Sequence, residues 1–138
     1  MQQNSLHGLL SELFEPYRRG DYQPITVSGD AVTIDDRSAT PLALLFHELA
    51  TNAMKYGALS SEDGAVDVTV ARDDADVVLC WSERGGPSVA APDGPHGFGS
   101  QLIELSAVRQ LGGVVTREWK AEGLVVTVRV PIATLNRA

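Results

Sequence analysis

The chain has a single cysteine, fewer basic than acidic residues, and no long apolar run. Its single cysteine, Cys80, cannot form an internal disulfide and lies in an apolar stretch that is typical of a buried structural thiol. The 11 Lys and Arg against 18 Asp and Glu give a net charge of −7, which argues against a nucleic-acid-binding surface. No apolar run is long enough to span a membrane, and the N-terminus lacks a signal-peptide pattern. We therefore expect a cytoplasmic protein with no nucleic acid partner and no membrane contact.

The 138 residues, of which 43% are hydrophobic, are enough for one domain with its own core. Apolar residues at helical spacing predict three helices, over residues 5–17, 40–56 and 100–111. Alternating apolar residues predict six strands, at 25–27, 31–34, 65–71, 75–82, 113–119 and 124–130. Because helices and hairpins are interleaved, we expect an α/β (α+β) two-layer sandwich, in which a mixed, mostly antiparallel sheet carries about three helices on one face.

The predicted helix over residues 40–56 carries the most polar chemistry. Thr40 can cap its start, Pro41 suits its first turn, and Gly57 suits a left-handed residue just past its end. The sequence therefore predicts a helix that begins near Thr40 and ends near Tyr56.

Four polar side chains of this helix fall near one face, because Glu48 and Asn52 are four residues apart and Lys55 and Tyr56 follow one turn later. The side-chain carbonyl of Asn52 can ligate Mg²⁺ beside a polyphosphate without adding negative charge. Glu48 can polarise an attacking group, and Lys55 can meet phosphate charge as a compact cation. The grouping predicts a metal–phosphate site, although a polar face that merely meets solvent explains this helix alone equally well.

A second motif, Trp81–Pro87, places the carboxylate of Glu83 at the end of an apolar strand, before Gly85 and Gly86. Such a carboxylate can accept a hydrogen bond from the exocyclic amine of adenine and would repel the carbonyl that guanine presents there. The two glycines would let the backbone approach the base. A surface turn with an exposed Glu is the alternative, and Trp81 is expected to belong to the core.

A third motif is rich in glycine and opens the last predicted helix. Its candidate ligand-binding positions are Gly97, Phe98, Gly99, Ser100 and Leu102. Backbone N–H groups at a helix N-terminus form a ready anion site. Alone, this motif is only a weak indication of phosphate binding.

In this order the three motifs resemble the N, G1 and G2 boxes of the GHKL ATP-binding domain, the Bergerat fold of histidine kinases, DNA gyrase and MutL. His47 at the head of the first motif, with Trp81 and Glu83 in the second, resembles the HWE histidine kinases, a bacterial subfamily. The resemblance covers about Leu6 to Pro131. It implies the ATP-binding catalytic (HATPase_c) domain of a two-component kinase, with ATP and Mg²⁺ as ligands.

The resemblance implies a role for each residue of the first motif. Asn52 would ligate Mg²⁺, Glu48 would take the general-base-like position, and Lys55 would lie near the phosphates. Tyr56 would lie near the ribose or the base. His47 defines the subfamily, and for it an orienting role beside the catalytic group is favoured over direct contact with nucleotide.

The same resemblance implies that Glu83 replaces the Asp with which most relatives read adenine. Gly85 and Gly86 would line the adenine pocket. The resemblance also implies that residues 88–96 form a lid over ATP. The remaining positions implied in cofactor binding follow this segment and are Gly97, Phe98, Gly99, Ser100 and Leu102.

Histidine kinases transfer the γ-phosphoryl group to a His on a separate helical dimerisation domain, from which it passes to a response regulator. The one His upstream of the first motif, His7, lacks the Arg and Asn that accompany the acceptor in the subfamily, so we do not expect it to be the acceptor. We expect residues 1–138 to form a single catalytic domain, excised or stand-alone, that acts on an acceptor domain absent from this chain.

Two alternatives remain open. The first is a degenerate module of the same fold that binds a partner protein and no nucleotide, as some histidine phosphotransferases do; the presence of Asn52 and Glu83 argues against it. The second is an ATPase or serine-directed kinase of the same superfamily, against which the Trp-x-Glu and His-Glu-Leu details argue.

Overall fold

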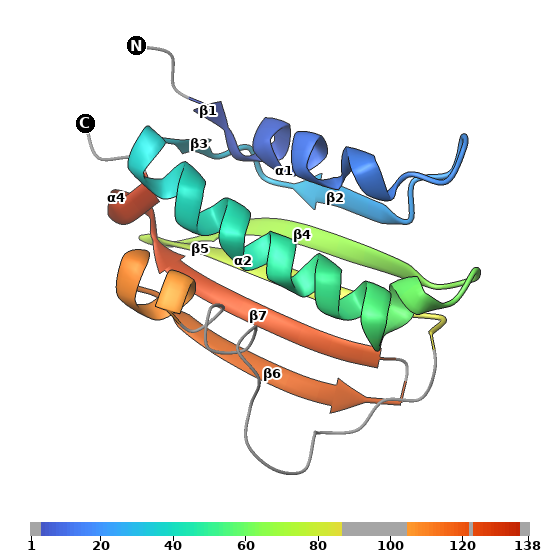
Figure 1. Ribbon diagram of the computed structural model, residues 1–138. Helices are drawn as coiled ribbons and strands as arrows, with labels where there is room; N and C mark the ends of the chain where they lie inside the picture. The colour runs from blue at the N-terminus through green and yellow to red at the C-terminus, as the bar shows by residue number, and fades with distance from the viewer. Residues whose placement is uncertain (1–3, 87–104, 122, 136–138) are drawn as a thin grey trace.

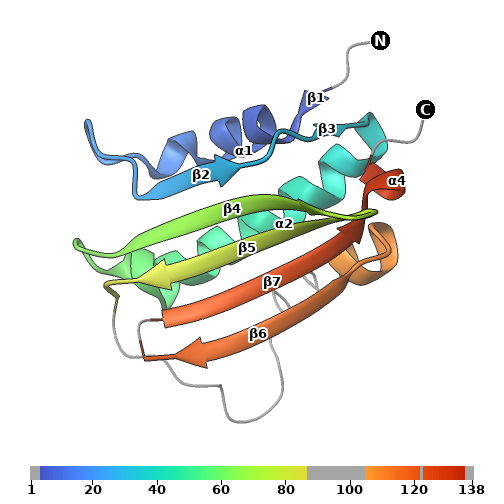
Figure 2. The same cartoon turned by 180° about the vertical axis from the view of Figure 1, so that it is seen from behind.

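The protein has two layers, a sheet and a set of helices packed on one of its faces. The computed structural model describes residues 4–86, 105–121 and 123–135. Helices α1 (Leu6–Phe14) and α2 (Asp36–Lys55) and the short helical turn η3 (Leu105–Gln110) lie on the same face (Figure 1). Seen from behind, the sheet carries no described helix on its other face (Figure 2). This arrangement confirms the expected two-layer sandwich.

In the described residues, the main sheet has five strands in the order β2-β4-β5-β7-β6. One pair, β2 with β4, is parallel, and the other three pairs are antiparallel. The strands are β2 (Ile25–Gly29), β4 (Ala65–Asp73), β5 (Asp76–Arg84), β6 (Val114–Lys120) and β7 (Gly123–Pro131). The short elements are β1 (Asn4–Ser5), β3 (Thr33–Ile34), η1 (Glu15–Tyr17), η2 (Ala58–Ser60) and α4 (Ile132–Leu135).

The sequence predicts short strands at 25–27 and 31–34 with a turn at residues 28–30 between them, and the structure differs from this expectation. β2 pairs with β4, whereas β3 pairs with β1 in a separate two-stranded sheet. The reason is that the turn stays bound to β4: the Asp30 amide donates to the carbonyl of Val70 (2.7 Å), and the Asp30 carboxylate accepts from the Arg72 amide (2.8 Å). With α2 as the crossover between them, β2 and β4 can run parallel.

The core centres on three aromatic rings from three elements. Phe14 of α1, Phe46 of α2 and Trp81 of β5 have ring centroids 5.9 to 6.2 Å apart, and each side chain is at most 1% exposed. The expectation that Trp81 belongs to the core is confirmed. Cys80, the residue before Trp81 in β5, points to the opposite face and is half-buried rather than buried, because that face carries no described helix.

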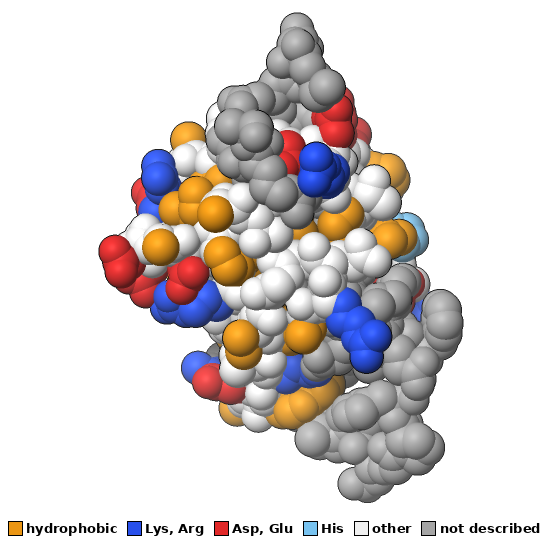
Figure 3. All heavy atoms as spheres, turned by 90° about the vertical axis from the view of Figure 1, so that its left-hand side faces the viewer, with side chains coloured by type: hydrophobic (Ala, Val, Ile, Leu, Met, Phe, Trp, Pro, Cys, Tyr) orange, Lys and Arg blue, Asp and Glu red, His pale blue; other side chains and the backbone are white. Residues whose placement is uncertain are grey.

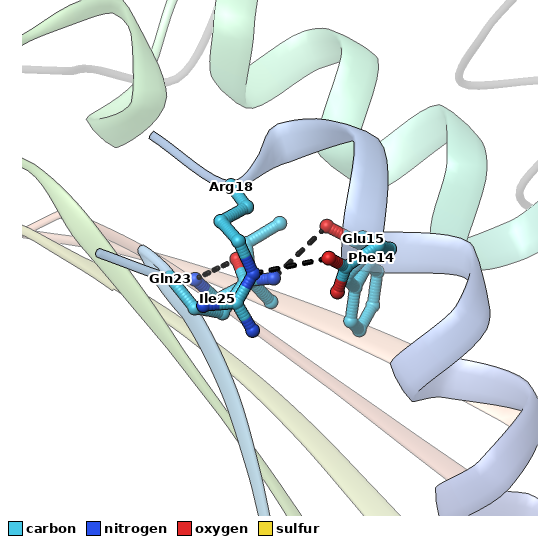
Figure 4. A network of polar contacts seen from close by, with 5 residues as sticks. All are labelled: Phe14, Glu15, Arg18, Gln23 and Ile25. Carbon is cyan, nitrogen blue, oxygen red and sulfur yellow. Dashed lines mark hydrogen bonds and ion pairs between the residues drawn. The ribbon is translucent and has the colours of Figure 1, made fainter. Parts of the chain in front are cut away.

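The end of α1 is tied to the start of β2 through one amide side chain (Figure 4). Gln23 donates through Nε2 to the carbonyl of Phe14 and accepts from the amide of Ile25, both at 3.1 Å. The exposed pair of Arg18 with Glu15 (3.1 Å) lies beside it. These contacts hold the first helix against the edge of the sheet.

The surface mixes charges of both signs. Figure 3 shows acidic, basic and hydrophobic side chains interspersed over one end of the molecule.

The turn between β4 and β5 is held to β7 by ion pairs. Arg129 of β7 donates to Asp73 (2.7 Å) and Asp76 (2.9 Å), which fastens the turn to the neighbouring strand. Among the described residues, no helix is long and apolar enough to cross a membrane.

Helix α2 begins earlier than the sequence predicts. Its cap is Asp35, whose carboxylate accepts from the Ser38 amide (2.9 Å), whereas Thr40 is an exposed residue within the helix. Ser38 is buried and donates to the carbonyl of Thr134 (2.9 Å), so the first turn is anchored on α4. Pro41 therefore lies inside the helix and not at its start.

We predict that Asp35→Ala lowers the free energy of unfolding by about 1 kcal/mol, because the first turn loses its cap. Urea denaturation followed by circular dichroism measures the change. Thr40→Ala is the matched control and should cost nothing, since alanine favours the interior of a helix. A larger loss for Thr40→Ala than for Asp35→Ala would contradict this helix start.

Candidate functional site

A buried carboxylate lies where β5 ends. Glu83 is 5% exposed, and both of its carboxylate oxygens accept hydrogen bonds from the protein. Its Oε2 accepts from the indole Nε1 of Trp81 (2.9 Å), and its Oε1 accepts from the amide of Ala58 (3.0 Å). The alternative of an exposed Glu in a surface turn is wrong. A charged group can be buried here because each oxygen has a donor.

The amide that reaches Glu83 comes from the segment after α2. Ala58 is the first residue of η2, so its N–H has no partner within that turn. The preceding Gly57 is buried, and a Cβ on it would overlap Oε1 of Glu83. Its φ is −115°, so the expected left-handed conformation is wrong. Glycine is required at this position for space, because the backbone must pass directly over the carboxylate.

Two further glycines pack around Ala58. A Cβ on Gly64 would overlap the Ala58 carbonyl oxygen, and a Cβ on Gly86 would lie 2.5 Å from the Ala58 Cα. Gly85 adopts a positive φ of 74°, which favours glycine. Packing of the backbone between β5 and η2 therefore accounts for these glycines, and the expected contact of Gly85 and Gly86 with a base stays a prediction.

Arg19 binds the backbone carbonyls of η2 and of the loop that follows it, and the sequence analysis did not single out this residue. Its guanidinium donates to the carbonyls of Leu59 (2.7 Å), Ser61 (3.1 Å) and Glu62 (3.3 Å). These carbonyls are 40 or more residues away in the chain, and no local pattern marks an arginine that binds backbone over such a separation. Arg19 thus fixes the turn whose amide meets Glu83.

The polar residues of α2 approach this end of the sheet along one flank of the helix. Glu48 and Asn52 are half-buried, whereas Lys55 is exposed and Tyr56 is 71% exposed. Among the described residues, no hydrogen bond engages the side chain of Glu48 or Asn52. These two side chains can therefore offer oxygen atoms to a ligand, and their expected roles, with those of Lys55 and Tyr56, stay predictions.

His47 lies on a different face of α2, toward α1. Consecutive residues of a helix are about 100° apart around its axis, so His47 does not share the flank of Glu48 and Asn52. It is exposed and lines an open apolar groove of about 400 Å³ between α1 and α2, with Leu9, Leu13 and Leu44 among its other walls. The structure does not bring His47 to the site residues that it describes, and the expected part of His47 in catalysis stays a prediction.

The third motif lies outside the described residues. This applies to Gly97, Phe98, Gly99, Ser100 and Leu102, which were expected to hold the phosphates. In the part of the chain that is described, α2 lies between α1 and η3 (Figure 1), and η3 contacts α2. No group of three His, Cys, Asp or Glu side chains gathers in that part to hold a metal.

The comparisons with known proteins concern the sequence and the fold of the chain. The chain is 38% identical over 130 residues to blue-light-activated histidine kinase 1 of Erythrobacter litoralis. The catalytic domain of the histidine kinase ThkA superposes with a TM-score of 0.70 at 17% identity, over 95% of this chain and 97% of that one. The chain is a homologue of histidine kinases. Its fold is that of their GHKL-type catalytic domain.

The sequence match covers nearly all of this chain but only part of its relative. It covers 93% of this chain and 36% of the E. litoralis kinase, so the chain spans about a third of that relative. A second solved structure, ThkA in complex with the response regulator TrrA, has a TM-score of 0.68 at 16% identity, over 96% of this chain and 42% of that one. No family model matches the chain.

We predict that Gly57→Ala lowers the free energy of unfolding by about 1–3 kcal/mol, because the added methyl group overlaps the Glu83 carboxylate. Gly8→Ala is the matched control. Its Cβ would meet nothing closer than Ser5 at 3.6 Å, so within α1 it should stabilise by roughly 0.5–1 kcal/mol. Urea denaturation of both variants measures the difference, and equal effects would contradict the close approach at Gly57.

Next to Glu83, Arg84 forms an exposed pair with Asp67 (3.0 Å), and its hydrogen bond lowers the pKa of Asp67 below the usual range. The stabilisation from this ionised carboxylate is present above a pH of about 4 and is lost as the pH falls through the lowered pKa.

We predict that Arg84→Met raises the pKa of Asp67 toward its ordinary value, because the donor is gone. Titration of the Asp67 carboxyl carbon by nuclear magnetic resonance measures the shift. Arg129→Met, which removes the partner of Asp73 and Asp76, should leave Asp67 unchanged. An unmoved Asp67 in Arg84→Met would show that the pair does not form in solution.

Proposed function

We propose that this chain is the ATP-binding catalytic domain of an HWE-type two-component histidine kinase, which transfers the γ-phosphoryl group of ATP to a His on a separate acceptor domain. The observation that carries the proposal is homology to a histidine kinase over 93% of the chain, combined with the buried carboxylate of Glu83. That carboxylate lies beside the end of α2, the helix that bears Glu48 and Asn52.

Glu83 is suited to accept from the amine of adenine. Each carboxylate oxygen has two lone pairs, and the protein uses one on each. A further donor can therefore bind, whereas a carbonyl oxygen at the same place would face a carboxylate that can only accept. Adenine is favoured over guanine for this reason.

The flank of α2 is suited to a nucleotide with its metal ion. Asn52 would hold Mg²⁺ through a neutral side-chain oxygen, which suits an ion that keeps most of its ligands from water and phosphate. When bound, Mg²⁺ neutralises charge that develops on the phosphates. Glu48, one turn earlier on the same half-buried flank, would orient the attacking group, and Lys55 would approach the phosphates from the exposed end of the helix.

The partners follow from the reaction. The γ-phosphoryl group needs a His acceptor, and we propose that a separate dimerisation domain supplies it and that a response regulator receives the group later. The structure of ThkA with TrrA is a complex of a histidine kinase with a response regulator, which supports a response regulator as a partner.

We predict that the chain binds Mg-ATP, that removal of Mg²⁺ weakens binding, and that Asn52→Ala does so by about tenfold, because one metal ligand is lost. Isothermal titration calorimetry with ATP and GTP measures the affinities. Met54→Ala is the matched control, since Met54 is an exposed residue of the same helix with no proposed role.

The kinase step has its own test. With ATP bound, a supplied acceptor domain should be labelled on His, and failure to label it would contradict the proposed transfer. If the folded wild-type chain does not bind Mg-ATP, the degenerate partner-binding module is favoured instead.

A further inference from the structure

We propose that Trp81 is a positioning residue for nucleotide selectivity: its indole N–H holds the Glu83 carboxylate in the orientation that admits an adenine amine and excludes a carbonyl. The inference rests on the proposed function and assigns to Trp81 a task beyond filling the core.

The first observation is that the carboxylate is held at both oxygens. Trp81 donates to Oε2 from within the same strand, and Ala58 donates to Oε1 from η2. Residues two apart on a strand point to the same face, so the Trp81 indole stands beside the Glu83 side chain. Two donors on two oxygens fix both the position and the plane of the carboxylate, whereas one donor would leave it free to rotate.

The second observation is that the indole itself cannot move. Trp81 is 1% exposed, and its ring lies against Phe14 at 5.9 Å and Phe46 at 6.2 Å. The buried indole therefore holds the carboxylate of Glu83 in place through the hydrogen bond from Nε1 to Oε2. An aliphatic side chain could fill the same space and would lack the donor.

The third observation is that the backbone closes around Glu83. Gly57 passes over its carboxylate, and a Cβ on Gly123 would overlap the Glu83 carbonyl oxygen. Gly57 thus confines Glu83 at its carboxylate and Gly123 confines it at its backbone and Cβ. With the donors in place, the carboxylate has one arrangement, so a base that presents an oxygen there meets a fixed acceptor.

Selectivity depends on that fixed arrangement. A mobile carboxylate can turn away from a carbonyl and lose little, whereas a held carboxylate imposes the full cost of two acceptors facing each other. Removal of the indole N–H should therefore relax discrimination between ATP and inosine triphosphate, which has a carbonyl in place of the amine.

The experiment compares the affinities of Mg-ATP and Mg-inosine triphosphate by calorimetry for the wild-type chain and for Trp81→Phe. Trp81→Phe keeps an aromatic ring and removes only the donor, and the ratio of the two dissociation constants should fall about tenfold. Phe46→Leu is the matched control: it keeps the indole N–H and the contact of Trp81 with Phe14, so the hydrogen bond to Glu83 should remain and the ratio should stay within about twofold of the wild type.

A second measurement tests the hydrogen bond without nucleotide. The chain has two tryptophans, and Trp119 is 38% exposed, so Trp119→Phe assigns the two indole N–H signals. The Trp81 indole proton should exchange with solvent much more slowly than that of Trp119. Glu83→Gln should speed its exchange, because the amide group of Gln places its own donor against either Trp81 or Ala58.

The outcomes are distinct. If the folded wild-type chain does not bind Mg-ATP, the proposed function fails, and this inference fails with it. If ATP binds but the ratio in Trp81→Phe equals that of the wild type, only the role of Trp81 is overturned. An equal fall in Phe46→Leu also overturns it, since packing and not the hydrogen bond would then set selectivity.

Discussion

The burial of one carboxylate organises this end of the molecule. Glu83 can stay buried only with a donor on each oxygen, and one donor must come from outside β5. The turn η2 supplies it, which brings the end of α2 against the end of β5. That approach leaves no room for side chains at Gly57 or Gly86, and Arg19 secures the turn by binding its carbonyls. The burial of the Glu83 carboxylate thus accounts for Gly57, Gly86 and Arg19, which shape or secure the turn that donates to it.

The same contact joins the two layers where the proposed nucleotide lies. Helix α2 contributes its half-buried polar flank, and β5 contributes the carboxylate, so both parts rest on regular elements and not on loops. The aromatic cluster beneath them immobilises Trp81, and through it Glu83. A site built in this way keeps its geometry before a ligand binds, which reduces the entropy that binding must overcome.

Local patterns predicted most of the fold. The first two helices, the helical turn at Leu105–Gln110, the longer strands and the place of Trp81 in the core follow from apolar spacing, which each segment carries by itself. The start of α2 was placed too late, at Thr40. The cap bond between Asp35 and Ser38 is local, whereas the bond from Ser38 to Thr134, 96 residues away, leaves no sequence pattern. The partner of β2 and the role of Arg19 depend on contacts of the same kind. For the site, the sequence identified Glu83 but not its donors, since the Ala58 amide has no signature in the sequence.

The three residues that suggest the subfamily do not form one group in space. His47 faces the groove between α1 and α2, whereas Trp81 and Glu83 are joined by a hydrogen bond at the end of β5. Neighbouring positions in a helical motif point in different directions, so His47 and Glu48 serve different surfaces although they are adjacent in the chain. A buried carboxylate needs a hydrogen-bond donor close to each oxygen, and the indole N–H of Trp81 is the donor for Oε2 of Glu83. Trp81 and Glu83 are thus joined as one hydrogen-bonded unit, while His47 belongs to the surface shared with α1.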